Sequence, residues 1–428
     1  MDSIFAQATA TGRAGVSVIR LSGVQAFDIA RIFCKLPQVG RTGLRAVRGR
    51  DGALIDQALV LCFEQGASFT GERVVEFQVH GGLATVAKLL SELSAQEGCR
   101  LAEPGEFTRR ALENGQLDLN QVEALSDLID AETESQRQQA IRVLDGRFGD
   151  AGEMWRGKLL RAAALLEASI DFSDEEIPDD LSVEVISLVE ETRASIAAIL
   201  ERSMMASKIR TGFTVAIIGA PNVGKSTLLN AIVGRQAAIT SDVAGTTRDV
   251  IECRVDLQGL AVSFLDTAGL RESEDEIEIL GISKAYEMAA AADIRVFLVE
   301  EVGEPLPIAL RDGDIVRLNK GDERSSEVGT VSGKTGEGVS ELLSLIAERL
   351  MVKTPQDVVA IRERQITGLR AAESFLGRVL ELTQADPLPF ELASQELYFA
   401  LSELDFVFGR IDIESVLDEI FSSFCLGK

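Results

Sequence analysis

One short segment limits what this chain can fold into more than any other. Residues 213–219 are mostly apolar, residues 219–226 follow the pattern G-x-x-x-x-G-K-S, and a leucine-containing stretch comes next. A buried strand, a glycine-rich loop and a helix start in this order form a phosphate-binding loop, whose N–H groups point at phosphate. In such a loop we expect Lys225 to reach the β- and γ-phosphates and Ser226 to bind Mg²⁺. The alternative is a glycine-rich turn without a ligand.

Four further patterns follow in the order expected of a GTP-binding domain. They are Gly245-Thr246-Thr247-Arg248-Asp249, Asp266-Thr267-Ala268-Gly269, Asn319-Lys320-Gly321-Asp322 and Ser332-Gly333-Lys334. The first offers Thr247 to the magnesium ion, and the second places an aspartate and a glycine N–H near the γ-phosphate. The Asp322 carboxylate can accept both the N1–H and the 2-amino group of guanine, a pair that adenine lacks. The set therefore predicts a GTPase and conflicts with an ATPase or a kinase.

Two positions depart from the best-known small GTPases. Leu270 stands where those proteins place a glutamine that orients the attacking water, and an apolar side chain cannot do this. The acidic residues between 272 and 278 are the place to look for a substitute, although for any one of them a solvated surface is the simpler explanation. Asn222 lies inside the phosphate loop, where its side-chain oxygen could hold a monovalent cation in place of an arginine finger. The alternative is a loop asparagine that tolerates an unusual backbone angle.

Hydrophobic spacing divides the rest of the chain. In the first hundred or so residues strand patterns alternate with a helical pattern, which predicts a small α/β or α+β domain. The strand patterns cover 16–19, 58–63 and 74–79, and the helical pattern covers 83–93. Helical spacing begins near Leu117, runs to about residue 205 and returns after Pro355. The simplest architecture is a helical domain with an α/β domain inserted into it, with predicted boundaries 1–116, 117–206, 207–353 and 354–428.

The charge is large and unevenly distributed. The 428 residues carry a formal net charge of −25, which argues against a broad basic face for nucleic acid, and the single histidine excludes a multi-histidine zinc site. Residues 1–117 hold 13 basic and 12 acidic side chains, whereas residues 118–205 hold 8 and 20. The five cysteines contain no C-x-x-C pair, and neither a secretory N-terminus nor an 18-residue apolar run is present. We therefore expect a soluble cytoplasmic protein.

Segments outside the GTP-binding motifs resemble one family, the tRNA-modification GTPases of the MnmE (TrmE) type. The resemblance covers nearly the whole chain, and its most specific piece is the C-x-G-K ending from Cys425 to Lys428. The other matching segments are Gly12 to Gly15, Val18 to Gly23, Thr70 to Glu72 with Glu76 and His80 to Gly82, Pro104 to Ala111, and Leu117 to Gln121. The resemblance implies a multidomain α/β and α fold. It comprises an N-terminal folate-binding-like α+β domain that dimerises, an all-α helical domain and an inserted P-loop, Ras-like α/β GTPase domain.

The resemblance also implies a folate site in the N-terminal domain. It would hold 5-formyl- or methylene-tetrahydrofolate as a one-carbon donor through Arg20, Glu76, Gln116 and Lys428. Relatives usually have lysine at the position of Gln116, so this chain loses a charge that would face an anionic cofactor. On the residues alone, Arg20 could pair with a carboxylate of the folate tail or be an ordinary surface arginine, and Glu76 could be a sheet-face carboxylate.

In the GTPase domain the resemblance assigns metal ligands and a catalytic glutamate. It implies K⁺ at Asn222, Ser241, Val243 and Thr246, Mg²⁺ at Ser226 and Thr247, and catalytic roles for Glu278, Lys225 and Cys425. Cys425 would serve the modification chemistry. Without the resemblance, a cysteine at this position is most simply explained as a small hydrophobic residue or an inert tail thiol. The complete predicted GTP site is Asn222, Val223, Gly224, Lys225, Ser226, Thr227, Ser241, Asp242, Val243, Ala244, Gly245, Thr246, Thr247, Asp266, Thr267, Ala268, Gly269, Asn319, Lys320, Asp322, Ser332, Gly333 and Lys334.

The resemblance implies a potassium-activated GTPase that modifies tRNA. As a homodimer, joined to a flavin-dependent partner in a heterotetramer, it would add a carboxymethylaminomethyl or aminomethyl group to C5 of the wobble uridine of certain tRNAs. The acidic charge leads us to expect that this partner supplies much of the basic surface that binds tRNA. The segment 300–318 is shorter than the corresponding segment of relatives, so we expect a surface helix to be missing or reduced there. The alternative is a GTPase switch acting as a ribosome- or RNA-assembly factor, which needs neither the folate-like domain nor the C-x-G-K tail.

Overall fold

The computed structural model describes residues 2–171, 179–236, 251–266, 287–319, 329–352, 362–385, 388–411, 417, 420–421 and 427. The chain divides into two compact units. The first contains Met1–Ser126, Gly149–Glu153 and Leu401–Lys428, and the second contains Asp127–Phe148 and Met154–Ala400. The fold is a mixture of α and β structure with many helices, in agreement with the predicted class.

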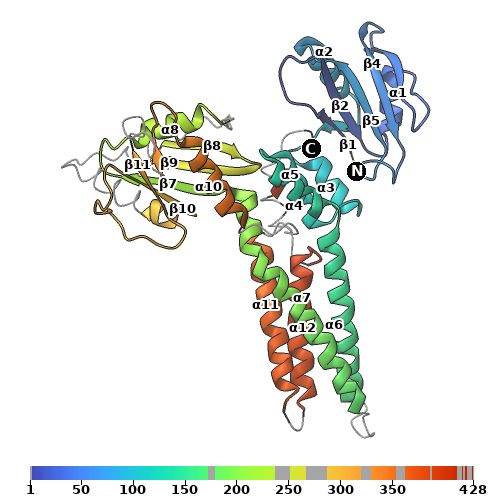
Figure 1. The fold of residues 1–428 in the computed structure, drawn as a ribbon. Coiled ribbons are helices and arrows are strands. Elements are labelled where there is room, and N and C mark those ends of the chain that lie inside the picture. Colours follow the sequence, from blue (N-terminus) through green and yellow to red (C-terminus); the bar gives the residue numbers. More distant parts are fainter. Residues whose placement is uncertain are drawn as a thin grey trace, which may run out of the picture. The chain divides into compact units, whose positions relative to one another are not determined.

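A six-stranded sheet lies at the centre of the first unit (Figure 1). Its order is β3-β4-β5-β2-β1-β6, and all neighbours are antiparallel except β1 and β6. The strands are β1 (Ser3–Gln7), β2 (Val16–Ser22), β3 (Gly43–Arg48), β4 (Leu54–Phe63), β5 (Val74–His80) and β6 (Cys99–Leu101). The strands predicted over 16–19, 58–63 and 74–79 are therefore confirmed.

The alternation of side chains along β2 and β5 decides which residues face the core. Ile19 and Leu21 of β2 and Phe77 of β5 are buried in one hydrophobic cluster with helices α1 (Ala26–Phe33) and α2 (Leu83–Ser94). Because successive strand residues point to opposite faces, Arg20 and Glu76 lie on the other face of the sheet. Two more helices, α3 (Glu106–Glu113) and α4 (Leu119–Ile129), follow β6.

The second unit contains the short helix α5 and most of four long helices, α6, α7, α11 and α12, which run side by side as a bundle (Figure 1). They are α5 (Glu134–Leu144), α6 (Arg147–Asp171), α7 (Asp179–Thr211), α11 (Glu363–Leu382) and α12 (Phe390–Val407). Trp155 of α6 is fully buried, and its indole N–H donates to the Ser195 hydroxyl of α7 at 3.0 Å. These helices account for the helical spacing predicted on both sides of residues 207–353.

Between α7 and α11 the chain forms a second six-stranded sheet, in the order β12-β11-β10-β7-β9-β8. All of its neighbours are parallel except the pair β8 and β9. Its elements are β7 (Phe213–Gly219), α8 (Lys225–Val233), β8 (Ile251–Leu257), β9 (Leu260–Asp266), β10 (Ile294–Val299), β11 (Ile315–Asn319), β12 (Thr330–Val331) and α10 (Val339–Val352). The described residues 300–314 contain no helix.

Buried side chains on both faces explain why the strands of this sheet are nearly continuous apolar runs. Helices α8 and α10 cover one face, and the segments around Ala289 and Leu306 pack on the other. Strand β7, in the middle of the sheet, has Val215 to Ile218 buried in these two clusters. Because β7, β9, β10 and β11 run parallel, their carboxyl ends lie at the same end of the sheet. This is where parallel sheets usually bind ligands.

Candidate functional site

The loop between β7 and α8 has the backbone of a phosphate-binding loop. Two of its residues, Asn222 at φ +63° and Gly224 at φ +98°, have left-handed backbone angles. A Cβ atom at Gly219 would lie 2.5 Å from the carbonyl oxygen of Leu298, and one at Gly224 would lie 2.6 Å from the Asn319 amide nitrogen. No side chain fits at either glycine, so the loop depends on both.

Lys225 places its ammonium group inside this loop. Its side chain is 4% exposed, and Nζ donates hydrogen bonds of 2.8 Å to the carbonyl oxygens of Gly219 and Ala220. Burial lowers the pKa of Lys225, and the negative charge of Asp266 acts in the opposite direction. The loop thus holds a partly desolvated cation at the start of a helix, where an anion is also favoured by the helix dipole.

Two oxygen groups meet beside this lysine. The Ser226 hydroxyl, in the first turn of α8, donates to Asp266 Oδ2 at 2.5 Å, and Asp266 is the buried last residue of β9. Hydroxyl and carboxylate oxygens are the ligands that Mg²⁺ prefers. The donor set at this position therefore fits a magnesium ion, and the assignment of Ser226 as its ligand stays a prediction.

The remaining described motifs lie against the same loop. Asn319 ends β11, is 8% exposed, and donates from Nδ2 to the backbone carbonyl of Val223. A Cβ atom at Gly333 would lie 2.6 Å from the backbone of Thr227. The structure thus brings together parts of four motifs that are spread over more than a hundred residues of the chain, from Gly219 to Lys334. Ser332 is buried and Lys334 is exposed.

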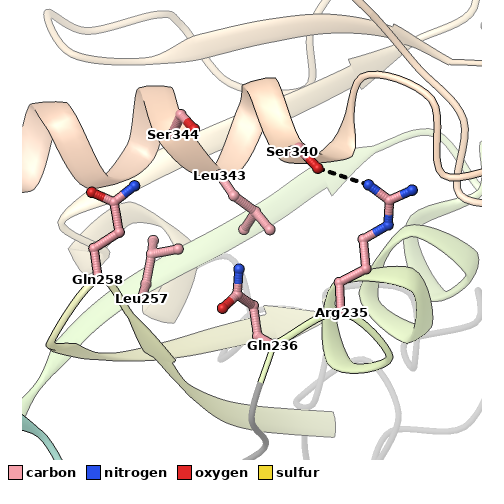
Figure 2. A pocket seen from close by; sticks show the side chains of 7 residues that line it. All are labelled: Arg235, Gln236, Leu257, Gln258, Ser340, Leu343 and Ser344. Atoms are coloured by element: carbon pink, nitrogen blue, oxygen red, sulfur yellow. Dashed lines mark hydrogen bonds between the residues drawn. The ribbon is translucent and has the colours of Figure 1, made fainter.

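A hollow of about 420 Å³ lies elsewhere in this part of the chain, between the end of α8, the β8–β9 turn and α10 (Figure 2). Arg235 donates to the Ser340 hydroxyl across it at 2.8 Å. The other lining residues are Gln236, Leu257, Gln258, Leu343 and Ser344. None of these seven residues belongs to the predicted GTP site.

In the first unit, two of the predicted folate residues form an ion pair. Arg20 and Glu76 are directly opposite each other in the pairing of β2 with β5, and Arg20 Nε donates to Glu76 Oε1 at 2.9 Å. The guanidinium carbon of Arg20 lies 5.6 Å from the centre of the Phe69 ring and 5.7 Å from that of Phe107. Arg20 is thus fixed by a carboxylate and two aromatic rings.

Gln116 and the C-terminal Gly427 pack against segments of the same domain that lie far from them in the sequence. Gln116 is exposed, and its Cγ would lie 3.1 Å from a Cβ atom built on Gly71. In the C-terminal tail, Gly427 is buried, and a Cβ atom there would lie 2.2 Å from the carbonyl oxygen of Gln7. Because Gln7 neighbours Ala6, the strand partner of Arg20, Gly427 lies beside the strand that pairs with β2.

Comparison with protein-family models decides the family. The model described as the MnmE helical domain matches residues 119–425 of the chain, and the model described as the N-terminus of the GTP-binding protein TrmE matches residues 3–116. The chain belongs to the MnmE family. The protein named tRNA modification GTPase MnmE from Roseobacter denitrificans is 52% identical over 429 residues, and the one from Ruegeria pomeroyi is 51% identical over 430 residues. Both alignments cover the whole of both chains.

Among solved structures, the Era GTPase of Aquifex aeolicus bound to GDP and aluminium fluoride is 25% identical to this MnmE-family chain. The match covers 38% of this chain and 66% of that one, with a TM-score of 0.26, which is too low to support an inference. In the described ranges, no helix combines the length and the apolar character that a membrane crossing requires.

Several predicted residues of this MnmE-family chain lie outside the described residues. These are Ser241, Asp242, Val243, Ala244, Gly245, Thr246, Thr247, Thr267, Ala268, Gly269, Glu278, Lys320, Asp322, Cys425 and Lys428. Their assignments stay predictions. The sequence did not single out Phe69, whose ring lies 5.6 Å from the Arg20 guanidinium carbon, nor Glu72 and Arg110, which form a buried ion pair. The motif segments at 70–72 and 104–111 were the only signal that could have pointed to them.

Proposed function

We propose that this chain is a GTP-hydrolysing enzyme that acts in tRNA modification. The observation that carries the proposal is the buried Lys225 inside a phosphate-binding loop, beside the Ser226–Asp266 pair. Its relatives at about 50% identity over the full length are named tRNA modification GTPases. With a flavin-dependent partner, the enzyme would add a carboxymethylaminomethyl or aminomethyl group to C5 of the wobble uridine of certain tRNAs.

The GTP site uses its residues for distinct tasks. Lys225 would bind the phosphates, Asn319 holds the loop in shape through Val223, and Asp322 would select guanine. Ser226 and Thr247 would hold Mg²⁺, which neutralises negative charge on the phosphates when bound. Glu278 would orient the attacking water, since an apolar residue stands at the usual glutamine position.

The same loop carries Asn222, the residue on which the proposed potassium activation rests, although its left-handed backbone equally fits a loop asparagine that holds no cation. Asn222 adopts a left-handed backbone angle and is exposed at the loop surface. This backbone explains why asparagine is tolerated there, and its side-chain oxygen would join Ser241, Val243 and Thr246 around K⁺. In this proposal the cation supplies the positive charge that an arginine finger supplies in other GTPases.

The folate site rests on Arg20 and Glu76. Their ion pair beside the partly exposed Phe69 ring combines a charged pair with an aromatic face, which suits a flat heterocycle with a carboxylate tail. Gln116 and Lys428 would complete it, and Cys425 would serve the modification chemistry. We further propose a homodimer through domain 1–116, with domains 117–206, 207–353 and 354–428, in a heterotetramer with the flavin partner.

Mass analysis of tRNA nucleosides tests the overall function. In cells that lack this protein, the wobble uridine modification should disappear from the affected tRNAs, and it should return with the wild-type gene but not with Lys225→Ala. Unchanged wobble uridines would reject the modification role and favour the assembly-factor alternative.

Turnover of GTP in KCl and NaCl tests the cation role. We expect turnover to fall by about tenfold or more in NaCl, which corresponds to ~1.4 kcal/mol of barrier. Asn222→Gly should remove most of this difference, because glycine keeps the left-handed backbone but loses the oxygen. Gln258→Gly is a matched control, since Gln258 at φ +53° is the other left-handed non-glycine residue among those described. Equal rates in the two salts for the wild type would reject the potassium site.

A further inference from the structure

A cluster of buried polar side chains lies beneath the loop that carries Phe69. Glu72 is at its centre. One of its carboxylate oxygens accepts a hydrogen bond of 2.7 Å from the Ser22 hydroxyl of β2, and both accept hydrogen bonds of 3.1 Å from Arg110 Nη1 of α3. Arg110 also donates to the backbone carbonyl of Asp2 at 3.0 Å and to Glu106 at 3.0 Å. Glu72 is 9% exposed and Arg110 is 6% exposed, so this ion pair is shielded from water.

The cluster fixes the backbone of residues 68–72. The Thr70 hydroxyl is 2.7 Å from that of Ser22, and the Ser68 hydroxyl donates to the backbone carbonyl of Glu72 at 2.5 Å. Asn114, which follows α3, donates from Nδ2 to the carbonyl of Thr70 at 2.7 Å. The loop is therefore tied to β2 on one side and to the end of α3 on the other.

This loop joins parts of the proposed folate site that lie far apart in the sequence. Phe69 is partly exposed and its ring faces the Arg20 guanidinium, while Gly71, at φ +75°, packs against Asn114 and Gln116. A shift of the loop would move the aromatic ring away from Arg20 and open the contact with Gln116. Neither Glu72 nor Arg110 needs to touch a ligand to have this effect.

We propose that the buried Glu72–Arg110 pair is a positioning device for the folate site, and that Phe69 is an additional binding residue whose ring stacks on the pterin-type ring of the ligand. The proposal rests on the folate site proposed above. An arginine is needed at position 110 because its planar fork reaches Glu72, Glu106 and a backbone carbonyl together, whereas a lysine has one nitrogen. The Glu72 carboxylate is needed because it accepts from Ser22 and Arg110 at the same time.

Titration of the full-length protein with 5-formyltetrahydrofolate, by calorimetry, tests the proposal. Arg110→Lys and Glu72→Gln should each weaken binding by at least about tenfold, and Phe69→Ala should do the same. GTP turnover and the mass of the dimer in solution should stay at the wild-type level. Arg73→Lys is the matched control, because Arg73 is in the same segment but pairs with Glu64 at the surface. It should leave folate affinity within about twofold of the wild type.

A double-mutant cycle separates positioning from a general structural effect. If Arg110 acts through the Phe69 loop, Arg110→Lys should weaken binding little further when Phe69 is already alanine. Additive losses would overturn the proposal, as would unchanged affinity in Arg110→Lys and Glu72→Gln. If those two variants do not fold, Thr70→Val, which replaces one hydroxyl of the cluster with a methyl group, should weaken folate binding in the same way. Absence of folate binding by the wild type would instead reject the folate site itself, and the positioning role with it.

Discussion

Replacing Asn319 with alanine tests how the GTP site is held together. The Nδ2 group of Asn319 donates to the backbone carbonyl of Val223, the residue between Asn222 and Gly224, which both have left-handed backbone angles. Asn319 is 8% exposed, so its removal leaves a carbonyl without this donor in a place that water reaches poorly. Leaving a buried acceptor unsatisfied costs about 1–3 kcal/mol. If the unsatisfied carbonyl disfavours the nucleotide-binding shape of the loop by this amount, the affinity for nucleotide falls by about 5- to 150-fold.

The assay is the binding of a fluorescent GDP analogue to the full-length chain at several protein concentrations. Asn319→Asp adds a sharper comparison, because it keeps the shape of the side chain but replaces the donor with an acceptor. We expect it to lose at least as much affinity as the alanine variant. Arg317→Ala, two residues earlier on the same strand, is the control, since its described hydrogen bond goes to Val316 and not to the loop. Wild-type affinity in Asn319→Ala would refute the reasoning.

Two further predictions concern the helical bundle and the buried thiols. Asp127→Ala removes an ion pair of 2.8 Å with Arg362 and a longer one of 3.9 Å with Arg210. We expect the free energy of unfolding in urea to fall by about 1–3 kcal/mol, less than for a fully buried pair, because Arg362 is a quarter exposed and because burial raises the pKa of Asp127 and so opposes its charged form. A fall in the free energy of unfolding of less than a few tenths of a kcal/mol would contradict this prediction. Burial raises the pKa values of Cys34, Cys62 and Cys99 from 9.0 to about 11. At pH 8 these thiols should resist iodoacetamide in the native protein but not in urea, as mass spectrometry would measure. Because unfolded thiols ionise first, stability should also fall as the pH rises from 9 to 11.

The local parts of the GTP site could be predicted from the sequence, but the contacts between them could not. The loop from Gly219 to Ser226 is one continuous pattern, so its strand, turn and helix follow directly from residue order. The contact of Asn319 with Val223 joins residues 96 positions apart, and it depends on β11 lying next to β10 in the sheet. The sequence motif assigns Asn319 to nucleotide recognition, whereas the structure adds that it supports the loop.

The pairing of Arg20 with Glu76 needed strand register, which hydrophobic patterns do not give. The patterns predicted strands over 16–19 and 74–79, so Arg20 lay just beyond the first of them. The structure extends β2 to Ser22 and places both side chains on the face opposite the hydrophobic core. Which residue of β5 stands opposite Arg20 is decided by the antiparallel register, and a shift by one residue would have paired Arg20 with a core position. The resemblance named both residues, yet only the register makes them partners.

The Glu72–Arg110 pair shows why buried charges are hard to find in a sequence. Glu106 and Arg110 are four residues apart in α3, and this spacing by itself predicts an exposed helix pair worth about 0.3–0.5 kcal/mol. In the fold, the same arginine reaches across to Glu72 and is almost fully buried. Removing either partner of such a pair leaves an uncompensated buried charge, at a cost of about 3–5 kcal/mol. Helical spacing gives the direction of a side chain but not what covers it, and here the covering loop is the one that carries Phe69.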